Sequence, residues 1–253
     1  MSQCDPDPSG LRDFLFGAII LKQLDPKRFV CIIWRAMKNT AYSTTDKDIR
    51  PSLKSVLAHQ YGNIKHTRIV EELGLHHGQV RVDVAVINGS LHGFEIKSDR
   101  DTLKRLGEQM RIYNSVLDYV TLVVGKNHVH EALEIIPAWW GVTRAEATQN
   151  RNIIFEKIRE AKINHSLDVL SVAKLLWRGE ALDVLETMGQ DHGVRSKPRS
   201  FIYGRLASAL PTEKLKEKVR ECLMSRKNWR CPAPLSQCDD LSQLVSTSKG
   251  TLY

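Results

Sequence analysis

The sequence has no apolar run long enough to cross a lipid bilayer, which takes about 18 consecutive residues. Its longest apolar run covers residues 14–21 and ends before Lys22. The opening residues, Met-Ser-Gln-Cys-Asp, do not place a basic stretch before an apolar one, so we expect no secretory signal. No Gly-rich loop of the kind that cradles nucleotide phosphates is found. We therefore expect a cytoplasmic protein that contacts no membrane and uses no ATP.

Cysteine is scarce. The chain of 253 residues has five cysteines, an odd number that does not suit a disulfide framework. Cys222, Cys231 and Cys238 are separated by eight and six residues, whereas zinc and iron–sulfur sites usually contain a tighter Cys-x-x-Cys pair. A structural role is favoured for these cysteines, with a metal site as the alternative.

Positive charge is concentrated toward the end of the chain. The net charge is +8, and residues 193–230 alone contain 11 Lys and Arg against three Asp and Glu. Such a block favours a polyanionic partner such as nucleic acid. A solvated helix face explains it equally well. Within the block, Arg195, Lys197 and Arg199 are the candidate contacts.

Hydrophobic patterning predicts an α/β core followed by helices. Residues 80–87 alternate and are rich in β-branched side chains, Asn-Gly follows at a turn, and residues 91–97 form the expected return strand. Residues 119–125 predict a buried strand, and residues 67–75 suit a strand or a helix end equally. Helices are expected over residues 11–37, 50–61, 99–117, 128–136, 145–190 and 205–229. Pro51 is expected in a first helical turn, and Ser98 with Asp101 in a capping box.

These patterns predict three regions. They are a helical lead-in over residues 1–45, a mixed-sheet core flanked by helices over residues 46–145, and a basic, all-helical region over residues 146–253.

The hairpin at residues 80–97 carries the chemistry. Side chains alternate faces along a strand, and directly opposed residues of an antiparallel pair point the same way. A three-residue turn at 88–90 opposes Asp83 to Glu95 and Arg81 to Lys97, whereas a two-residue turn opposes Asp83 to Phe94. We predict the three-residue turn, with Asn88 or Gly89 at positive φ.

Two neighbouring carboxylates repel each other unless they share a proton or bind a cation. Mg²⁺, or Mn²⁺ in its place, suits such oxygen ligands. Lys97 lies one pleat beyond Glu95, where an ammonium could orient an attacking water and offset phosphate charge. The alternative is a solvated strand face with cross-strand ion pairs, but the flanking residues are apolar, which favours the metal site.

Asp83 followed by Glu95-Ile96-Lys97 resembles the signature of the PD-(D/E)XK, or restriction-endonuclease-like, nuclease superfamily. Gln109-x-x-x-Tyr113 resembles the motif of RecB-like nucleases, and Glu71-Glu72 resembles the acidic residue of the first motif. The longer string is similar to a bacterial family of uncharacterised PD-(D/E)XK-type proteins over residues 48–141. It comprises Glu72-Leu73-Gly74, Arg81-Val82-Asp83, Glu95-Ile96-Lys97-Ser98-Asp99 and Trp139-Trp140-Gly141.

The resemblance implies a restriction-endonuclease-like mixed sheet and a role for each matching residue. Asp83, Glu95, the Ile96 carbonyl and Glu72 would hold the metal, although the sequence leaves open whether Glu71 or Glu72 faces the site. Lys97 would serve the water. Gln109 and Tyr113 would contact the substrate or support Lys97. Around this site, the cations expected to contact phosphates are Arg81, Lys104, Arg105 and Arg111.

The hypothesis is a Mg²⁺-dependent nuclease that cleaves DNA, with RNA left open as a substrate. Because many nucleases of this type act in assemblies, a homodimer or larger assembly also stays open. The alternatives are a nucleic-acid-binding module that retains the fold without catalysis, and a partner protein whose basic end binds an acidic protein.

Overall fold

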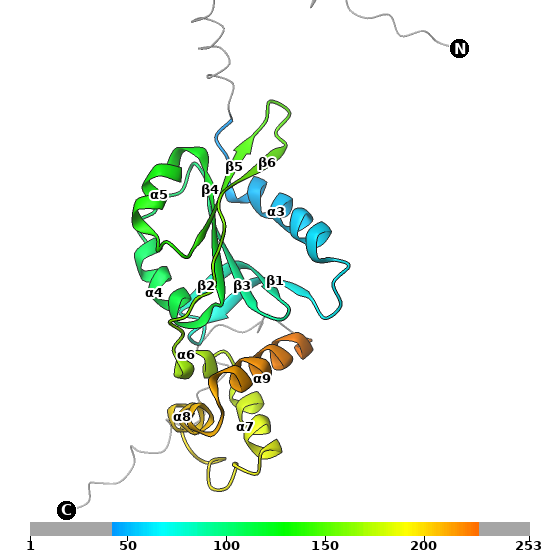
Figure 1. Cartoon of the computed structure of the whole chain (residues 1–253), viewed down its shortest axis with the longest axis vertical. Coiled ribbons are helices and arrows are strands. Elements are labelled where there is room, and N and C mark those ends of the chain that lie inside the picture. Colours follow the sequence, from blue (N-terminus) through cyan, green and yellow to red (C-terminus); the bar gives the residue numbers. More distant parts are fainter. Residues whose placement is uncertain (1–41, 228–253) are drawn as a thin grey trace, which may run out of the picture.

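The computed structural model describes residues 42–227, which form a six-stranded sheet and a set of helices beyond it (Figure 1). The strands occur in the sheet in chain order: β1 (Arg68–Leu75), β2 (Val80–Ile87), β3 (Leu91–Lys97), β4 (Tyr119–Gly125), β5 (Gly141–Ala147) and β6 (Ile153–Arg159). The β1–β2, β2–β3 and β5–β6 pairs are antiparallel, and the β3–β4 and β4–β5 pairs are parallel. The prediction of a mixed sheet in an α/β protein is confirmed.

Helices cover both faces of the sheet (Figure 1). On one face, α3 (Asp46–Tyr61) buries Ile49, Leu53 and Leu57 against strand residues such as Val84 and Phe94. On the other face lie α4 (Leu106–Val116) and α5 (Val129–Ile135), the latter preceded by the 3₁₀ turn η1 (Lys126–His128). Strand residues thus bury alternate side chains in two separate cores, which leaves few positions for polar groups in the central strands.

The β2–β3 hairpin has the predicted three-residue turn, because Ile87 pairs with Leu91 and Val84 with Phe94. The prediction of positive φ at Asn88 or Gly89 is wrong. The side chain of Asn88 closes the turn instead, since its Oδ1 accepts hydrogen bonds from the backbone N–H and the hydroxyl of Ser90 at 3.0 and 3.1 Å. With the side chain supplying this closure, the backbone does not need the left-handed conformation.

Two predicted helices begin elsewhere. The α3 helix starts at Asp46, one turn earlier than expected, because the Asp48 carboxylate accepts hydrogen bonds from the N–H and hydroxyl of Thr45. Pro51 therefore lies inside the helix and not in its first turn. The α4 helix starts at Leu106 and not at residue 99, and the Ser98–Asp101 hydrogen bonds close a turn before it.

The prediction of helices from residue 145 onward is wrong as far as Arg159, because this segment completes β5 and forms β6. The β5 strand has only Val142 and Thr143 as β-branched residues, and in β6 a Glu-Lys pair follows three apolar residues. Neither strand therefore shows the alternation of β2 or the continuous apolar run of β4. The β6 strand is an edge strand with most of its side chains exposed or half-buried. Its conformation is decided by its pairing with β5 and not by the local preference of its residues.

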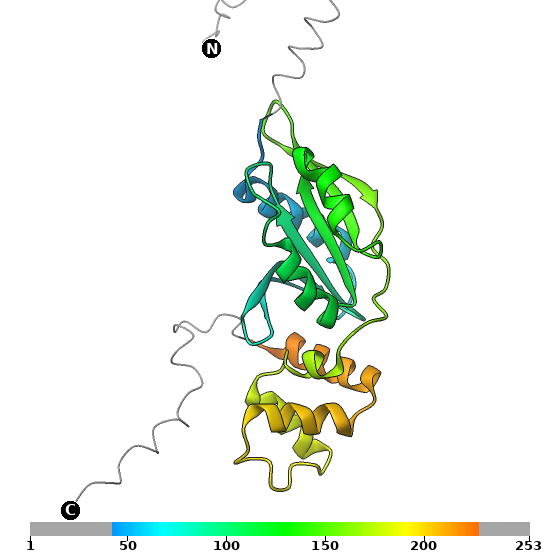
Figure 2. The same cartoon turned by 90° about the vertical axis from the view of Figure 1, so that its left-hand side faces the viewer.

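Beyond β6 the secondary structure of the described chain is helical, as predicted, and consists of α6 (Val169–Ala173), α7 (Arg178–Thr187), α8 (Arg199–Ala209) and α9 (Thr212–Ser225). The predicted bounds differ, because residues 160–168 form no helix and the helix expected over 205–229 is divided between α8 and α9. These helices gather at one end of the sheet in both views (Figures 1 and 2).

The α9 helix is attached to the sheet by an ion pair. The Lys216 ammonium of α9 lies 2.8 Å from Oδ1 of Asp118, which is buried beside β4. None of the helices within residues 42–227 is long and apolar enough to cross a membrane. The predicted helix at 11–37 and the cysteines at 231 and 238 lie outside the described residues.

Candidate active site

Asp83 and Glu95 lie on neighbouring strands, toward the end of the β2–β3 hairpin that is farther from the turn. The pairing of the hairpin extends as far as Val84 and Phe94, and Asp83 and Glu95 are the next residues on the two strands. Oδ2 of Asp83 accepts a hydrogen bond of 2.7 Å from the backbone N–H of Ile96, which fixes the carboxylate across the two strands. Glu95 is 1% exposed, so a charged group stands inside the sheet. A buried carboxylate of this kind needs hydrogen bonds or a counter-ion.

Three predicted site residues meet at the Glu95 carboxylate. The Lys97 ammonium lies 2.5 Å from Oε1, and Nε2 of Gln109 donates to the same oxygen at 2.7 Å. The Tyr113 hydroxyl lies 2.6 Å from Oε2. Gln109 and Tyr113, one turn apart on α4, thus face the carboxylate together.

Arg50 of α3 is a site residue that the sequence did not single out. Its guanidinium donates to Oδ1 of Asp83 at 2.7 Å and to the Asp83 carbonyl at 3.1 Å. It also donates to Oε1 of Glu72 at 2.8 Å and to both carboxylate oxygens of Asp46. The available signal was the i,i+4 spacing of Asp46 and Arg50, which predicts only a local ion pair.

The choice between the two neighbouring glutamates is decided by the β1 strand. Glu72 reaches Asp83 through Arg50, whereas Oε1 of Glu71 lies 2.5 Å from the Lys54 ammonium. Glu72 has a φ of +53°, which is unusual for a residue other than glycine within a strand. Buried positions change phase along β1 at this residue, from Val70 to Leu73. The kink therefore turns Glu72 toward the site.

The carboxylates of the site are electrostatically unfavourable as a pair. Burial, followed by the charge of Glu95, raises the pKa of Asp83 well above its ordinary value, and the Ile96 N–H and Arg50 oppose this shift only in part. Burial together with the Glu95 charge also raises the pKa of Tyr113, so its hydroxyl stays protonated and remains a donor. Additional positive charge beside Asp83 would therefore stabilise its ionised form.

The family model of bacteriophage P4 protein cII matches residues 40–233. The chain belongs to this family. Protein cII of Enterobacteria phage P4 is 30% identical over 128 residues, which cover 51% of this chain and 48% of the phage protein. The chain thus spans about half the length of this curated relative. Among solved structures, SPO1766, a protein of unknown function from Silicibacter pomeroyi, is 19% identical, with a TM-score of 0.30 over 56% of this chain and 89% of that one.

The match to the P4 cII family includes every residue of the Asp83–Glu95 cluster and also the helical region up to α9. Of the cations predicted to contact phosphates, four lie close in the sequence to residues of the carboxylate cluster and three lie in the helical region. Arg81 on β2, Lys104 and Arg105 before α4, and Arg111 on α4 are exposed, and none of them forms an ion pair within residues 42–227. Arg81 lies on the strand that carries Asp83, and the other three lie on or just before the helix that carries Gln109 and Tyr113.

The second group of predicted contacts lies in the helical region of this family member. Arg195 is paired with Glu186 at 2.8 Å and with Asp191 at 3.5 Å. The Lys197 ammonium lies 5.8 Å from the ring centre of Phe201 on α8. Arg199 begins α8, which packs on the neighbouring helices α6, α7 and α9. The structure therefore does not bring Arg195, Lys197 and Arg199 to the carboxylate cluster.

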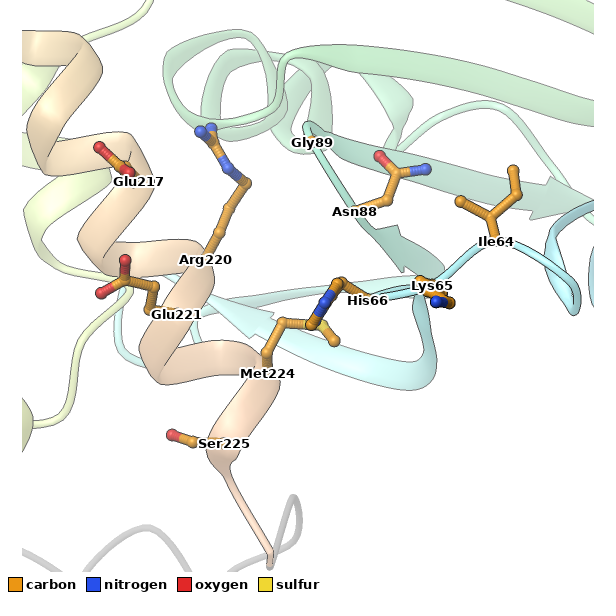
Figure 3. A pocket seen from close by; sticks show the side chains of 10 residues that line it. All are labelled: Ile64, Lys65, His66, Asn88, Gly89, Glu217, Arg220, Glu221, Met224 and Ser225. Atoms are coloured by element: carbon orange, nitrogen blue, oxygen red, sulfur yellow. The ribbon is translucent and has the colours of Figure 1, made fainter.

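A cleft of about 880 Å³ lies between the sheet and α9 (Figure 3). One wall is the segment before β1 with the β2–β3 turn, and the other is α9, from which Arg220 extends toward the turn at Gly89. None of the predicted catalytic residues lines it. In this member of the P4 cII family the carboxylate cluster and the cleft are therefore separate features at opposite ends of the hairpin.

Proposed function

We propose that this protein is a metal-dependent nuclease that hydrolyses phosphodiester bonds of DNA at Asp83, Glu95 and Lys97. The observation that supports the proposal most strongly is the convergence of side chains on Glu95. The lysine two residues later on the same strand and the Gln–Tyr pair of the next helix meet at this one buried carboxylate. A strand face that served only as a solvated surface would not bury its charges in this way.

The donor set fits a hard divalent cation. Asp83, Glu95 and Glu72 offer carboxylate oxygens, and the Ile96 carbonyl is the proposed backbone ligand. Within residues 42–227, no three His, Cys, Asp or Glu side chains gather closely enough to hold an ion by themselves. Such a site suits Mg²⁺ or Mn²⁺, since Mg²⁺ usually keeps several waters. When bound, the ion would polarise the phosphoryl oxygen and lower the pKa of a water.

Lys97 is the residue proposed to act on that water. Its side chain is 10% exposed, so the ammonium is held near the carboxylates with little freedom to move into solvent. From there it can donate a hydrogen bond to a water or to a phosphate oxygen as negative charge develops. Gln109 and Tyr113 are positioning residues in this proposal, because they hold both oxygens of Glu95 in place.

The substrate is proposed from charge. Arg81, Lys104, Arg105 and Arg111 are exposed cations with no ion-pair partner in the described part of the chain. Cations that are not neutralised within a protein are free to contact phosphates, which supply most of the affinity for nucleic acid. DNA is the proposed polyanion, and RNA is the competing one.

A second candidate function is a nucleic-acid-binding module without catalysis. The observation that favours it is the position of Arg50, whose guanidinium already occupies one oxygen each of Asp83 and Glu72. In such a module the carboxylates would serve only to fix the hairpin to α3.

One experiment separates the two functions. Wild type, Asp83→Asn and Lys97→Ala are compared for cleavage of single- and double-stranded DNA with Mg²⁺ or Mn²⁺, and for Mn²⁺ binding by isothermal titration calorimetry. Lys54→Ala is the control, because Lys54 also lies 2.5 Å from a glutamate but outside the cluster. Cleavage by wild type and Lys54→Ala alone supports the nuclease. Cleavage that survives in both site variants contradicts the site, and DNA binding without Mn²⁺ binding or cleavage in wild type supports the module.

A further inference from the structure

The guanidinium of Arg50 uses all its hydrogen-bond donors within the carboxylate cluster. Nε and one terminal nitrogen bind Asp46, the same terminal nitrogen binds Oδ1 of Asp83, and the other binds Glu72 and the Asp83 carbonyl. A guanidinium has five N–H groups, so none is left over. The side chain is 19% exposed. Arg50 is therefore fixed among three carboxylates, unlike a surface arginine that exchanges partners freely.

The cluster has more negative than positive charge even with Arg50 in place. Its charged members are Asp46, Glu72, Asp83, Glu95, Arg50 and Lys97. Four carboxylates and two cations leave two negative charges when all are ionised, which is the charge that one divalent ion neutralises. Arginine does not lose its proton in proteins, so its charge is present at every pH at which the protein is folded.

We propose that Arg50 is a built-in counter-ion that competes with the divalent cation for Asp83 and Glu72 and so sets the affinity of the site. The inference rests on the proposed function, because it takes these oxygens as metal ligands. A metal that binds Oδ1 of Asp83 or Oε1 of Glu72 must replace or share an N–H···O bond of 2.7 or 2.8 Å. It must also approach a fixed positive charge, which opposes it through the low-dielectric interior.

The competition keeps the metal-free cluster stable and its metal binding weak. Without Arg50, three carboxylates would lose their shared counter-ion and would bind a divalent ion more tightly. Asp46 pairs with Arg50 from the preceding turn of α3. It holds the guanidinium when a metal replaces the guanidinium at the Asp83 carboxylate. The arrangement gives a site that loads only at a sufficient metal concentration.

The test measures Mn²⁺ affinity of the full chain by isothermal titration calorimetry at constant pH and salt. Arg50→Met removes the charge and keeps a long apolar side chain, and Arg50→Lys keeps the charge. Lys218→Met is the matched control, because it removes a cation paired with a carboxylate, Glu221, on α9. We expect Arg50→Met to bind Mn²⁺ at least about tenfold more tightly than wild type, and Arg50→Lys and the control to stay within about threefold. Unchanged or weaker binding by folded Arg50→Met overturns the inference.

A second measurement does not depend on the folding of Arg50→Met. Wild-type protein with ¹⁵N-labelled arginine is titrated with Mg²⁺, and the Nε resonance of Arg50 is assigned by its absence in Arg50→Lys. We expect this resonance to move with the same midpoint as metal binding, because the guanidinium loses its bonds to Asp83 and Glu72. A resonance that stays in place while Mg²⁺ binds overturns the competition.

The failure of this inference can be told from the failure of the proposed function. Mn²⁺ binding that Asp83→Asn abolishes but Arg50→Met leaves unchanged removes the counter-ion role and keeps the metal site. Tighter binding by Arg50→Met in a protein that cleaves no DNA keeps the counter-ion role and removes the nuclease. A lack of Mn²⁺ binding in wild type and Arg50→Met alike removes both.

Discussion

The hydroxyl of Tyr113 lies 2.6 Å from Oε2 of Glu95 and 2.8 Å from the carbonyl oxygen of Arg81. One side chain of α4 thus connects both strands of the hairpin. The Tyr113 ring is itself held in place, because the ring of Trp140 stacks against it with 6.0 Å between centroids. Trp140 is 0% exposed, and its indole N–H donates to Asn114. The orientation of Glu95 is therefore determined by a buried chain of contacts that runs from Trp140 through Tyr113.

Tyr113→Phe is expected to lower stability and weaken metal binding together. The substitution keeps the ring and its packing but leaves Oε2 of Glu95 without its donor. Loss of a buried hydrogen bond to a charged group costs about 1–3 kcal/mol of the free energy of unfolding. We expect Mn²⁺ affinity to fall by about tenfold, because the carboxylate is no longer held in one orientation. Urea unfolding and calorimetric titration measure the two effects.

Tyr203→Phe is the control for this substitution. Tyr203 is also buried and donates its hydroxyl hydrogen bond to the Leu176 carbonyl at 2.9 Å, but it lies on α8 in the helical region. We expect a similar loss of stability with unchanged Mn²⁺ affinity. Equal effects of both substitutions on affinity would mean that Tyr113 acts on the site only through global stability.

Lys216→Met is expected to weaken the attachment of α9 to the sheet. Its ammonium lies 2.8 Å from Oδ1 of Asp118, with side-chain exposures of 13% and 4%. Removal of one partner leaves a buried carboxylate without its counter-ion, which costs about 3 kcal/mol of the free energy of unfolding. Asp118→Asn added to Lys216→Met should recover part of the loss, because the uncompensated charge is then absent. Chemical unfolding of both variants measures this recovery.

Lys214→Met provides the comparison for that pair. Lys214 lies 2.9 Å from Glu217 on the same helix, but both side chains are exposed. Ion pairs in solvent contribute little, so the stability of this variant should stay close to that of wild type. Equal losses for the Lys214 and Lys216 variants would contradict the buried character of the Asp118 pair.

The stability of the protein should depend on the neutral form of His92. Burial lowers the pKa of this β3 histidine to about 4 from its ordinary value of 6.5, opposed in part by the charge of Glu160. Between these values the unfolded chain binds more protons than the folded one, so stability decreases as the pH falls from 6.5 toward 4. The full effect is on the order of 3 kcal/mol. His92→Gln should lack this component in urea unfolding series at pH 7, 5.5 and 4.5, and an identical pH dependence in both proteins would contradict it.

The central site could be predicted from sequence because its geometry depends on local rules. The two-residue period of strands and a three-residue turn are enough to place Asp83 opposite Glu95. The four-residue spacing of Gln109 and Tyr113 places them on one helix face. Each of these relationships spans a hairpin or a single helical turn. The structure confirms the three-residue turn, which leaves Asp83 and Glu95 as the residues that follow the last pair of the hairpin, and the shared face of the Gln–Tyr pair.

Arg50 and the last two strands could not be predicted, because each depends on contacts between distant segments. Arg50 reaches a residue 33 positions away, and nothing in the local pattern distinguishes it from other helix arginines. The β5 and β6 strands mix apolar residues with Ala, Glu, Lys and Arg, which are good helix formers, so their composition does not decide between helix and strand. Their conformation follows from pairing with β4 and with each other. A local pattern therefore predicts the buried strands more successfully than the edge of the sheet.

DNA binding should depend on the cations near the Asp83–Glu95 site that form no ion pair in the described part of the chain. Lys104 and Arg105 are exposed next to the start of α4 and form no ion pair within residues 42–227. If each contacts one phosphate, the Lys104→Ala, Arg105→Ala double variant should bind duplex DNA more weakly. Its slope of log affinity against log salt should be shallower by about 0.9 per lost contact. The Lys157→Ala, Lys218→Ala double variant removes the same charge from residues already paired with Glu160 and Glu221. Fluorescence anisotropy in EDTA, from low to moderate salt, compares the two. Equal slopes in both variants would mean that net charge alone, and not contact at the start of α4, attracts DNA.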